Sequence, residues 1–126
     1  MFKNIFLAGT VGISNFKEEL TDRGIPAETI VKESSPTNLV VYYFGNTEEA
    51  LGGFFPVWVR VFQKAIMALY DEPDRTVIVF DTMGLYYRSR KRILDAHFLL
   101  KQRFPKADIF ASPFEAADSI VKKFKP

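Results

Sequence analysis

The sequence contains no cysteine and a single histidine, His97. Without cysteine the chain has no disulfide scaffold, no thiolate nucleophile and no cysteine-bound metal. One histidine argues against a histidine-based metal site and against a catalytic triad, and we expect neither a metal nor a cofactor. His97 itself is expected to pack against its own domain as an ordinary helix residue rather than to act as a ligand or base.

Net charge is nearly absent as well, because 17 basic residues face 15 acidic ones and leave a formal charge of +2. A balance so close to zero gives no reason to expect nucleic acid as the main partner. Long apolar runs are also missing: no window approaches the ~18 residues of a membrane span. The apolar first twelve residues lack the cleavage pattern of a secretory signal. We therefore expect no membrane partner and a cytoplasmic location.

Apolar residues are abundant: they make up 48% of the 126 positions, and 13 of them are phenylalanine. That much apolar surface offsets the entropy of ordering a chain, so the sequence is not that of a disordered protein. The length fits one folded unit. We expect a single domain over residues 1–126 with a bulky aromatic core.

Short apolar runs predict buried strands. The three clearest are Asn4–Gly9, Leu39–Phe44 and Thr76–Phe80. Asp108–Ala111 predicts a shorter strand, and Glu28–Lys32 a weaker one.

Helices are predicted between these runs from capping residues and from apolar spacing. Asn15 and Glu18 resemble a capping box that starts a helix, which runs to about Arg23 and ends at Gly24. The other predicted helices run from about Pro56 to Asp71–Asp74, from Ser89 to Arg103, and from the N-cap Ser112 to Phe124.

The resulting order is β-α-β-β-α-β-α-β-α, with strands that are continuously apolar rather than alternating. Continuous runs are typical of parallel strands that are buried on both faces. We therefore predict an α/β fold: a single small three-layer domain with a mostly parallel, four- to five-stranded sheet and helices on both faces, of the Rossmann/flavodoxin-like type.

Three of the predicted strands are followed by glycine-containing polar turns, namely Gly9–Gly12, Gly45–Glu48 and Asp81–Gly84. Parallel sheets bind ligands beyond the carboxyl ends of their strands, and glycine lets the backbone approach a ligand closely. The alternative is that such turns need these residues for their own geometry. The predicted ligand-binding residues are Gly9, Thr10, Gly12, Asn46, Asp81, Thr82 and Gly84.

The one concentrated basic run, Arg88–Arg92, opens a predicted helix just after the Asp81 turn. Arg88 and Arg90 could face a phosphate group or an acidic partner. The alternative is a solvated first helical turn. The aromatic residues near Gly52–Trp58 could line a pocket or the surface of a homodimer, although core packing is the favoured role.

Several of these segments are similar to the nucleoside 2-deoxyribosyltransferase-like family. Ile5–Thr10 (IFLAGT) resembles the opening strand and turn of that family, and Asn15-Phe16 with Glu18–Leu20 resembles the helix that follows. Further along the chain, the resembling segments are Asn38–Phe44, Thr76–Phe80 and Tyr86–Lys91.

The resemblance implies a nucleoside- or nucleotide-binding domain that could act as an N-glycosidic-bond transferase or hydrolase. In that family a glutamate early in the helix after the third strand attacks the anomeric carbon of the sugar, which needs a carboxylate to form a glycosyl ester. Here residues 56–65 contain no carboxylate, and Glu48 and Glu49 are the only local substitutes. They are the candidate catalytic residues, and the missing match leaves open a domain that binds without catalysis.

The alternative function is a regulatory or protein-interaction module without catalysis. The succession of short strands and helices, with a closing Glu-Ala-Ala helix at Glu115–Ala117, also resembles STAS-type modules, which act through a helix face.

Overall fold

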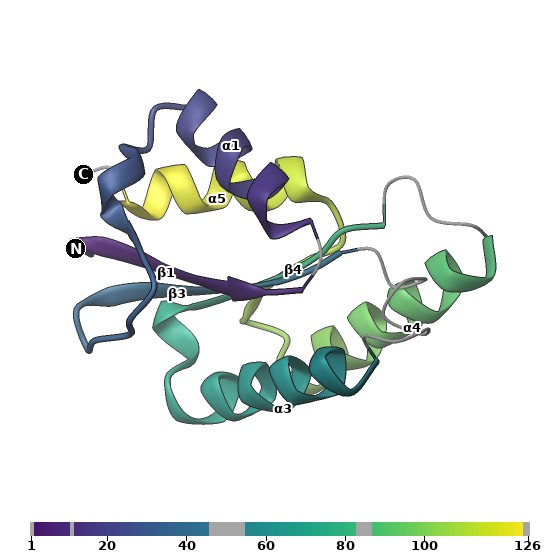
Figure 1. Cartoon of the computed structure of the whole chain (residues 1–126). Coiled ribbons are helices and arrows are strands. Elements are labelled where there is room, and N and C mark those ends of the chain that lie inside the picture. Colours follow the sequence, from purple (N-terminus) through teal and green to yellow (C-terminus); the bar gives the residue numbers. More distant parts are fainter. Residues whose placement is uncertain (1, 11, 46–54, 83–86, 125–126) are drawn as a thin grey trace.

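The structure is a computed structural model that describes residues 2–10, 12–45, 55–82 and 87–124. At positions 55–58, 87–90 and 92 the description covers the backbone alone. Figure 1 shows a twisted β-sheet with helices packed on both of its faces.

The strands of the sheet are β1 (Asn4–Gly9), β2 (Ile30–Val31), β3 (Asn38–Phe44), β4 (Thr76–Phe80) and β5 (Asp108–Phe110). All five run parallel, in the spatial order β2-β1-β3-β4-β5. This is the flavodoxin-like order, in which the chain first builds outward from β1 to β2 and then reverses direction at β3. The predicted α/β fold with a parallel sheet is confirmed.

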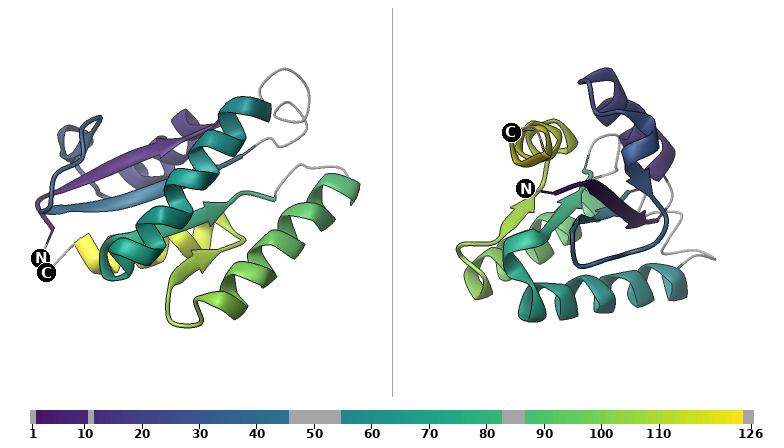
Figure 2. Two further views of the ribbon diagram at one scale, coloured as in Figure 1. Left: turned by 90° about the horizontal axis from the view of Figure 1, so that it is seen from below. Right: turned by 90° about the vertical axis from the view of Figure 1, so that its left-hand side faces the viewer.

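Of the helices that the structure describes, two cover each face of the sheet. Figures 1 and 2 show α1 (Ile13–Asp22) and α5 (Pro113–Phe124) on one face, and α3 (Phe55–Asp71) and α4 (Tyr87–Arg103) on the other. The side chains of β3 alternate between two cores: Leu39, Val41 and Tyr43 join the α1/α5 core, whereas Val40, Tyr42 and Phe44 join the α3/α4 core. Because both faces are covered, every residue of β3 is buried, which explains its continuously apolar sequence.

The link from β2 to β3, residues 32–37, crosses β1 without forming a helix. Two side chains hold it in place. The Asn38 side-chain amide donates to the Glu33 carbonyl oxygen at 3.1 Å, and its Oδ1 lies 3.1 Å from Ser35 Oγ. The Arg75 guanidinium donates to the carbonyl oxygens of Ser35 and Asn38 at 2.9 and 3.0 Å. These bonds give the backbone of a short crossover the partners that a helix would otherwise supply.

The start of α1 differs from the predicted capping box. The helix begins at Ile13, two residues before Asn15, and its N-cap is Gly12, which has a left-handed backbone (φ 97°) and makes no side-chain cap bond. Asn15 therefore lies inside the first turn, and the predicted Asn15–Glu18 capping box is wrong. The positive φ of Gly12 turns the chain directly from β1 into the helix, a conformation that glycine adopts without strain.

The predicted end of α1 at Gly24 is confirmed. Gly24 has a φ of 98° and donates its N–H to the Thr21 carbonyl oxygen, while Ile25 donates to Leu20. This pair of hydrogen bonds is the Schellman motif, which satisfies the last carbonyl groups of a helix.

The remaining boundaries shift by a few residues. β2 is shorter than the predicted Glu28–Lys32 because Ala27–Thr29 form a 3-10 turn, and α4 begins at Tyr87 rather than Ser89. The predicted N-cap of α5 is present, since the Glu115 N–H points to Ser112 Oγ at 3.5 Å. Among the described helices, none has both the length and the apolar character needed to cross a bilayer.

Candidate functional site

β1 and β3 lie unusually close together where both strands end. A Cβ on Gly9 would lie 2.3 Å from the Tyr43 carbonyl oxygen, so no larger residue fits without moving the backbone. Thr10 donates its N–H to the same carbonyl oxygen at 3.0 Å, and its Oγ1 lies 3.1 Å from both the nitrogen and the oxygen of Gly45. The turns that follow β1 and β3 are therefore tied to each other, as predicted for one edge of a parallel sheet.

The end of β4 joins the same edge through Asp81. Its N–H donates to the Phe44 carbonyl oxygen at 2.8 Å, and its Oδ2 accepts a hydrogen bond from the Tyr43 hydroxyl at 2.5 Å. The Phe16 ring of α1 stacks on the Tyr43 ring, with centroids 5.1 Å apart and planes 23° from parallel. This stack holds the phenol in place and aims its hydroxyl at the carboxylate.

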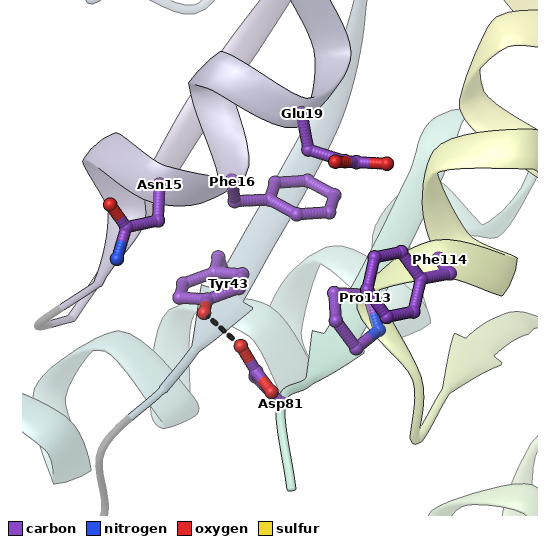
Figure 3. A pocket seen from close by; sticks show the side chains of 7 residues that line it. All are labelled: Asn15, Phe16, Glu19, Tyr43, Asp81, Pro113 and Phe114. Carbon is purple, nitrogen blue, oxygen red and sulfur yellow. Dashed lines mark hydrogen bonds between the residues drawn. The ribbon is translucent and has the colours of Figure 1, made fainter. Parts of the chain in front are cut away.

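A cavity of about 210 Å³ opens beside the Tyr43–Asp81 pair, between α1 and the start of α5 (Figure 3). Its lining residues come from four elements or the turns beside them: Asn15, Phe16, Glu19, Tyr43, Asp81, Pro113 and Phe114. In Figure 3 the Phe16 and Tyr43 rings form one wall and Pro113 and Phe114 face them from the other side. Pockets for drug-sized molecules start at about 300 Å³, so the cavity suits a single planar ring with its substituents.

An ion-pair chain holds Glu19, the lining residue at the cavity's edge on α1. Arg23 donates from Nε to Glu19 Oε1 at 2.8 Å and from Nη1 to Oδ1 of Asp118 on α5. The guanidinium thereby holds the Glu19 carboxylate at the cavity rim and fastens α1 to α5. Exposed ion pairs contribute little to stability, so the chief effect of Arg23 is on the placement of Glu19.

The polar lining of the cavity is acidic. Glu19 and Asp81 supply carboxylates, Asn15 supplies an amide, and lysine and arginine are absent from the lining residues that the structure describes. Burial, the hydrogen bond to Asp81 and the charge of Asp81 together raise the pKa of Tyr43 well above its usual value. The phenol therefore stays protonated and remains a donor to Asp81 at every physiological pH.

We expect Tyr43→Phe to lower the free energy of unfolding by about 1–3 kcal/mol near neutral pH, because Asp81 loses a donor while the ring stack remains. In wild type, an unfolded tyrosine releases its proton near pH 10 whereas folded Tyr43 keeps it. The contribution of this proton to stability is thus complete below about pH 9, and above about pH 10 it declines by about 1.4 kcal/mol per pH unit.

Urea unfolding of both proteins from about pH 7 to about pH 11 measures this effect. The difference in free energy of unfolding between wild type and the phenylalanine variant should stay constant up to about pH 9 and then shrink. An advantage that is independent of pH over the whole range would show that the phenol does not titrate abnormally.

The predicted ligand-binding residues that the structure describes all lie at this edge of the sheet, but they have different roles there. Asp81 lines the cavity, whereas Gly9 and Thr10 join the strands beside it. Gly12 lies next to the Tyr43 hydroxyl, from which an added Cβ would be 3.3 Å away. The Thr82 hydroxyl donates to the Ala111 carbonyl oxygen at 3.2 Å and so connects the ends of β4 and β5.

Other predicted positions lie outside the described residues. These are Asn46, Glu48, Glu49 and Gly84, together with the side chains of Arg88 and Arg90, of which only the backbone in the first turn of α4 is described. Of the Gly52–Trp58 segment, only the backbone from position 55 onward is described. Catalysis by Glu48 or Glu49 stays a prediction.

Six lining residues were not predicted as site residues: Asn15, Phe16, Glu19, Tyr43, Pro113 and Phe114. One of them carried a usable signal. Tyr43 stands at the carboxyl end of a buried strand, and a buried tyrosine usually needs a partner for its hydroxyl. Asp81, at the end of the next strand in the sequence, was the available acceptor.

His97 packs as predicted. Its Nε2 lies 3.1 Å from the Ile109 carbonyl oxygen, and its ring meets the Phe80 ring edge-on at 6.5 Å. Within the described ranges, no group of three or more histidine, aspartate or glutamate side chains is placed to hold a metal ion.

Comparison of the chain with protein-family models, with curated proteins and with solved structures finds no match. The cavity and its lining side chains are therefore the structural features of this chain that indicate a function.

Proposed function

We propose that this chain is a nucleoside- or nucleotide-binding domain and that the ring of the base occupies the cavity between α1 and α5. The observation that carries the proposal is the lining itself: aromatic side chains on two opposite walls, with the carboxylates of Glu19 and Asp81 between them and the Asn15 amide beside one wall. Aromatic walls favour a flat ring, since base–aromatic stacking contributes about 1–3 kcal/mol per base. Polar groups between the walls suit the hydrogen-bonding edge of such a ring.

The position of the cavity in the fold supports the same proposal. The strand order β2-β1-β3-β4-β5 reverses between β1 and β3, and parallel sheets bind ligands beyond the carboxyl ends of the strands at such a reversal. Tyr43 and Asp81 stand at the carboxyl ends of β3 and β4. The small volume of the cavity accommodates the base, and the sugar and any phosphate extend outside it.

The resemblance to nucleoside 2-deoxyribosyltransferases adds a catalytic form of the proposal. In that form Glu48 or Glu49 is the nucleophile on the anomeric carbon, and the chain breaks an N-glycosidic bond. Arg88 and Arg90 are the residues proposed for a phosphate. The proposed binding of the base in the cavity involves none of these four side chains, so it can be tested separately from catalysis and from phosphate binding.

Binding is tested by denaturing the chain with and without single nucleosides and their 5′-monophosphates. A ligand at one hundred times its Kd should raise the free energy of unfolding by about 2.7 kcal/mol. Phe114→Ala should weaken the bound ligand by about tenfold or more, because Phe114 lines one wall and is already 47% exposed, so that its loss costs little stability.

The matched control is Phe98→Ala, which removes a phenylalanine that is 59% exposed on α4, on the other face of the sheet. That variant should bind as wild type does. Equal losses of ligand affinity in the two variants would mean that Phe114 does not contact the ligand. If no nucleoside or monophosphate in the panel stabilises the chain, the proposal is refuted.

The second candidate function, an interaction module that acts through a helix face as in STAS-type modules, has one observation in its favour. On α4, Leu94, Phe98 and Leu99 are 40%, 59% and 63% exposed. Large apolar side chains gathered on the surface are typical of protein-interaction sites. A panel of nucleosides without effect on stability would favour this function.

A further inference from the structure

We infer that the cavity selects rings that carry an amino group over rings that carry an oxo group at the same position, with Glu19 as the residue that discriminates. The inference rests on the proposed function, because it concerns which bases the cavity takes. It follows from the hydrogen-bonding capacity of the lining side chains.

The first observation is that the Tyr43 hydroxyl, a donor in the wall of the cavity, is already engaged. Tyr43 has one hydroxyl proton, and it is directed to Asp81 Oδ2 at 2.5 Å. The same hydroxyl cannot donate to an oxygen of a ligand without giving up Asp81. Of the lining side chains that the structure describes, only the amide of Asn15 then has protons to offer.

The second observation is the anchoring of Glu19. Arg23 engages Oε1 of this carboxylate, and within the described part of the chain Glu19 has no other side-chain hydrogen bond. An ionised carboxylate only accepts hydrogen bonds. Since Arg23 is also held by Asp118, Glu19 cannot turn away from the rim without breaking the chain of ion pairs.

An amino group next to Glu19 donates to the carboxylate, whereas an oxo group at that position brings two sets of lone pairs together. Inosine and uridine carry their N–H on the neighbouring ring atom, so they reach Glu19 only by shifting within the cavity. Sites built around one hydrogen bond discriminate strongly against an analogue that cannot make it. Glu19 is about 30% exposed, so water screens part of the repulsion. We expect adenosine to bind about tenfold more tightly than inosine, and cytidine about tenfold more tightly than uridine.

The experiment measures the Kd of these four nucleosides by calorimetry for wild type, Glu19→Gln and Glu18→Gln. The glutamine amide both donates and accepts hydrogen bonds. Glu19→Gln should therefore bring two Kd ratios, inosine to adenosine and uridine to cytidine, close to one. Glu18 is an exposed neighbour on α1 outside the cavity lining, and Glu18→Gln removes the same charge. It should keep the wild-type ratios.

The wild-type ratios decide the inference even if a variant does not fold. Ratios near one, or a preference for the oxo bases, overturn it while the proposed function stands. Failure of all four nucleosides to bind overturns both. Ratios that collapse equally in the Glu18 and Glu19 variants would show a general charge effect and overturn the role given to Glu19.

Discussion

Replacing Gly9 with alanine is expected to lower the free energy of unfolding by about 3 kcal/mol. The added Cβ would lie 2.3 Å from the Tyr43 carbonyl oxygen and 3.0 Å from its Cβ. The carbonyl cannot retreat freely, because it accepts the Thr10 N–H at 3.0 Å. The two strands must therefore separate at the edge where the cavity lies, at a large cost for a domain whose total stability is about 5–15 kcal/mol.

Urea unfolding measures this loss, and Gly24→Ala is its control. Gly24 also has a positive φ, 98°, but it ends a helix outside the sheet. Alanine there should cost only the about 1–2 kcal/mol of a left-handed backbone. A loss at Gly9 no greater than that at Gly24 would mean that β1 and β3 are not as close as the geometry indicates.

Phe44→Ala is expected to cost still more, about 4 kcal/mol. The Phe44 ring is fully buried and stacks on Phe80 with centroids 5.3 Å apart, while Phe62 of α3 meets it edge-on at 5.7 Å. Removing the ring leaves a cavity that two neighbouring rings, each with its own contacts, cannot fill by small movements.

The same urea experiment checks this value, with Phe44→Leu as the comparison. Leucine keeps most of the volume and should cost about 1.5 kcal/mol or less. If the two substitutions cost the same, the loss would come from the aromatic contacts rather than from the empty space.

The fold could be predicted from the sequence because its signals are local. The runs Leu39–Phe44 and Thr76–Phe80 lack the alternating polar residues of a strand with one solvent-exposed face, so they indicated a sheet that is covered on both faces. Ser112, Pro113 and Glu115 marked the start of α5 through residue preferences at a helix N-terminus. The start of α1 was missed because a glycine with positive φ leaves no pattern in the neighbouring side chains.

The candidate site could be predicted only as an edge of the sheet. Asp81 was identified because it follows a clear strand. Phe16 and Phe114 were not, because an aromatic residue at an apolar helix position looks the same whether it fills a core or lines a cavity. Their meeting depends on how α1 and α5 pack over the sheet, and no local pattern reports a contact between segments so distant in the sequence.

The Arg23–Asp118 ion pair joins residues 95 positions apart, the C-cap residue of the first described helix and a residue of the last. The two walls of the cavity consequently face each other only while α5 is docked on the sheet. Partial detachment of α5 would open the cavity without unfolding the strands, and such local openings need less free energy than global unfolding. A ligand bound between both walls would oppose that detachment. Binding in the cavity should therefore slow hydrogen exchange of the α5 backbone amides.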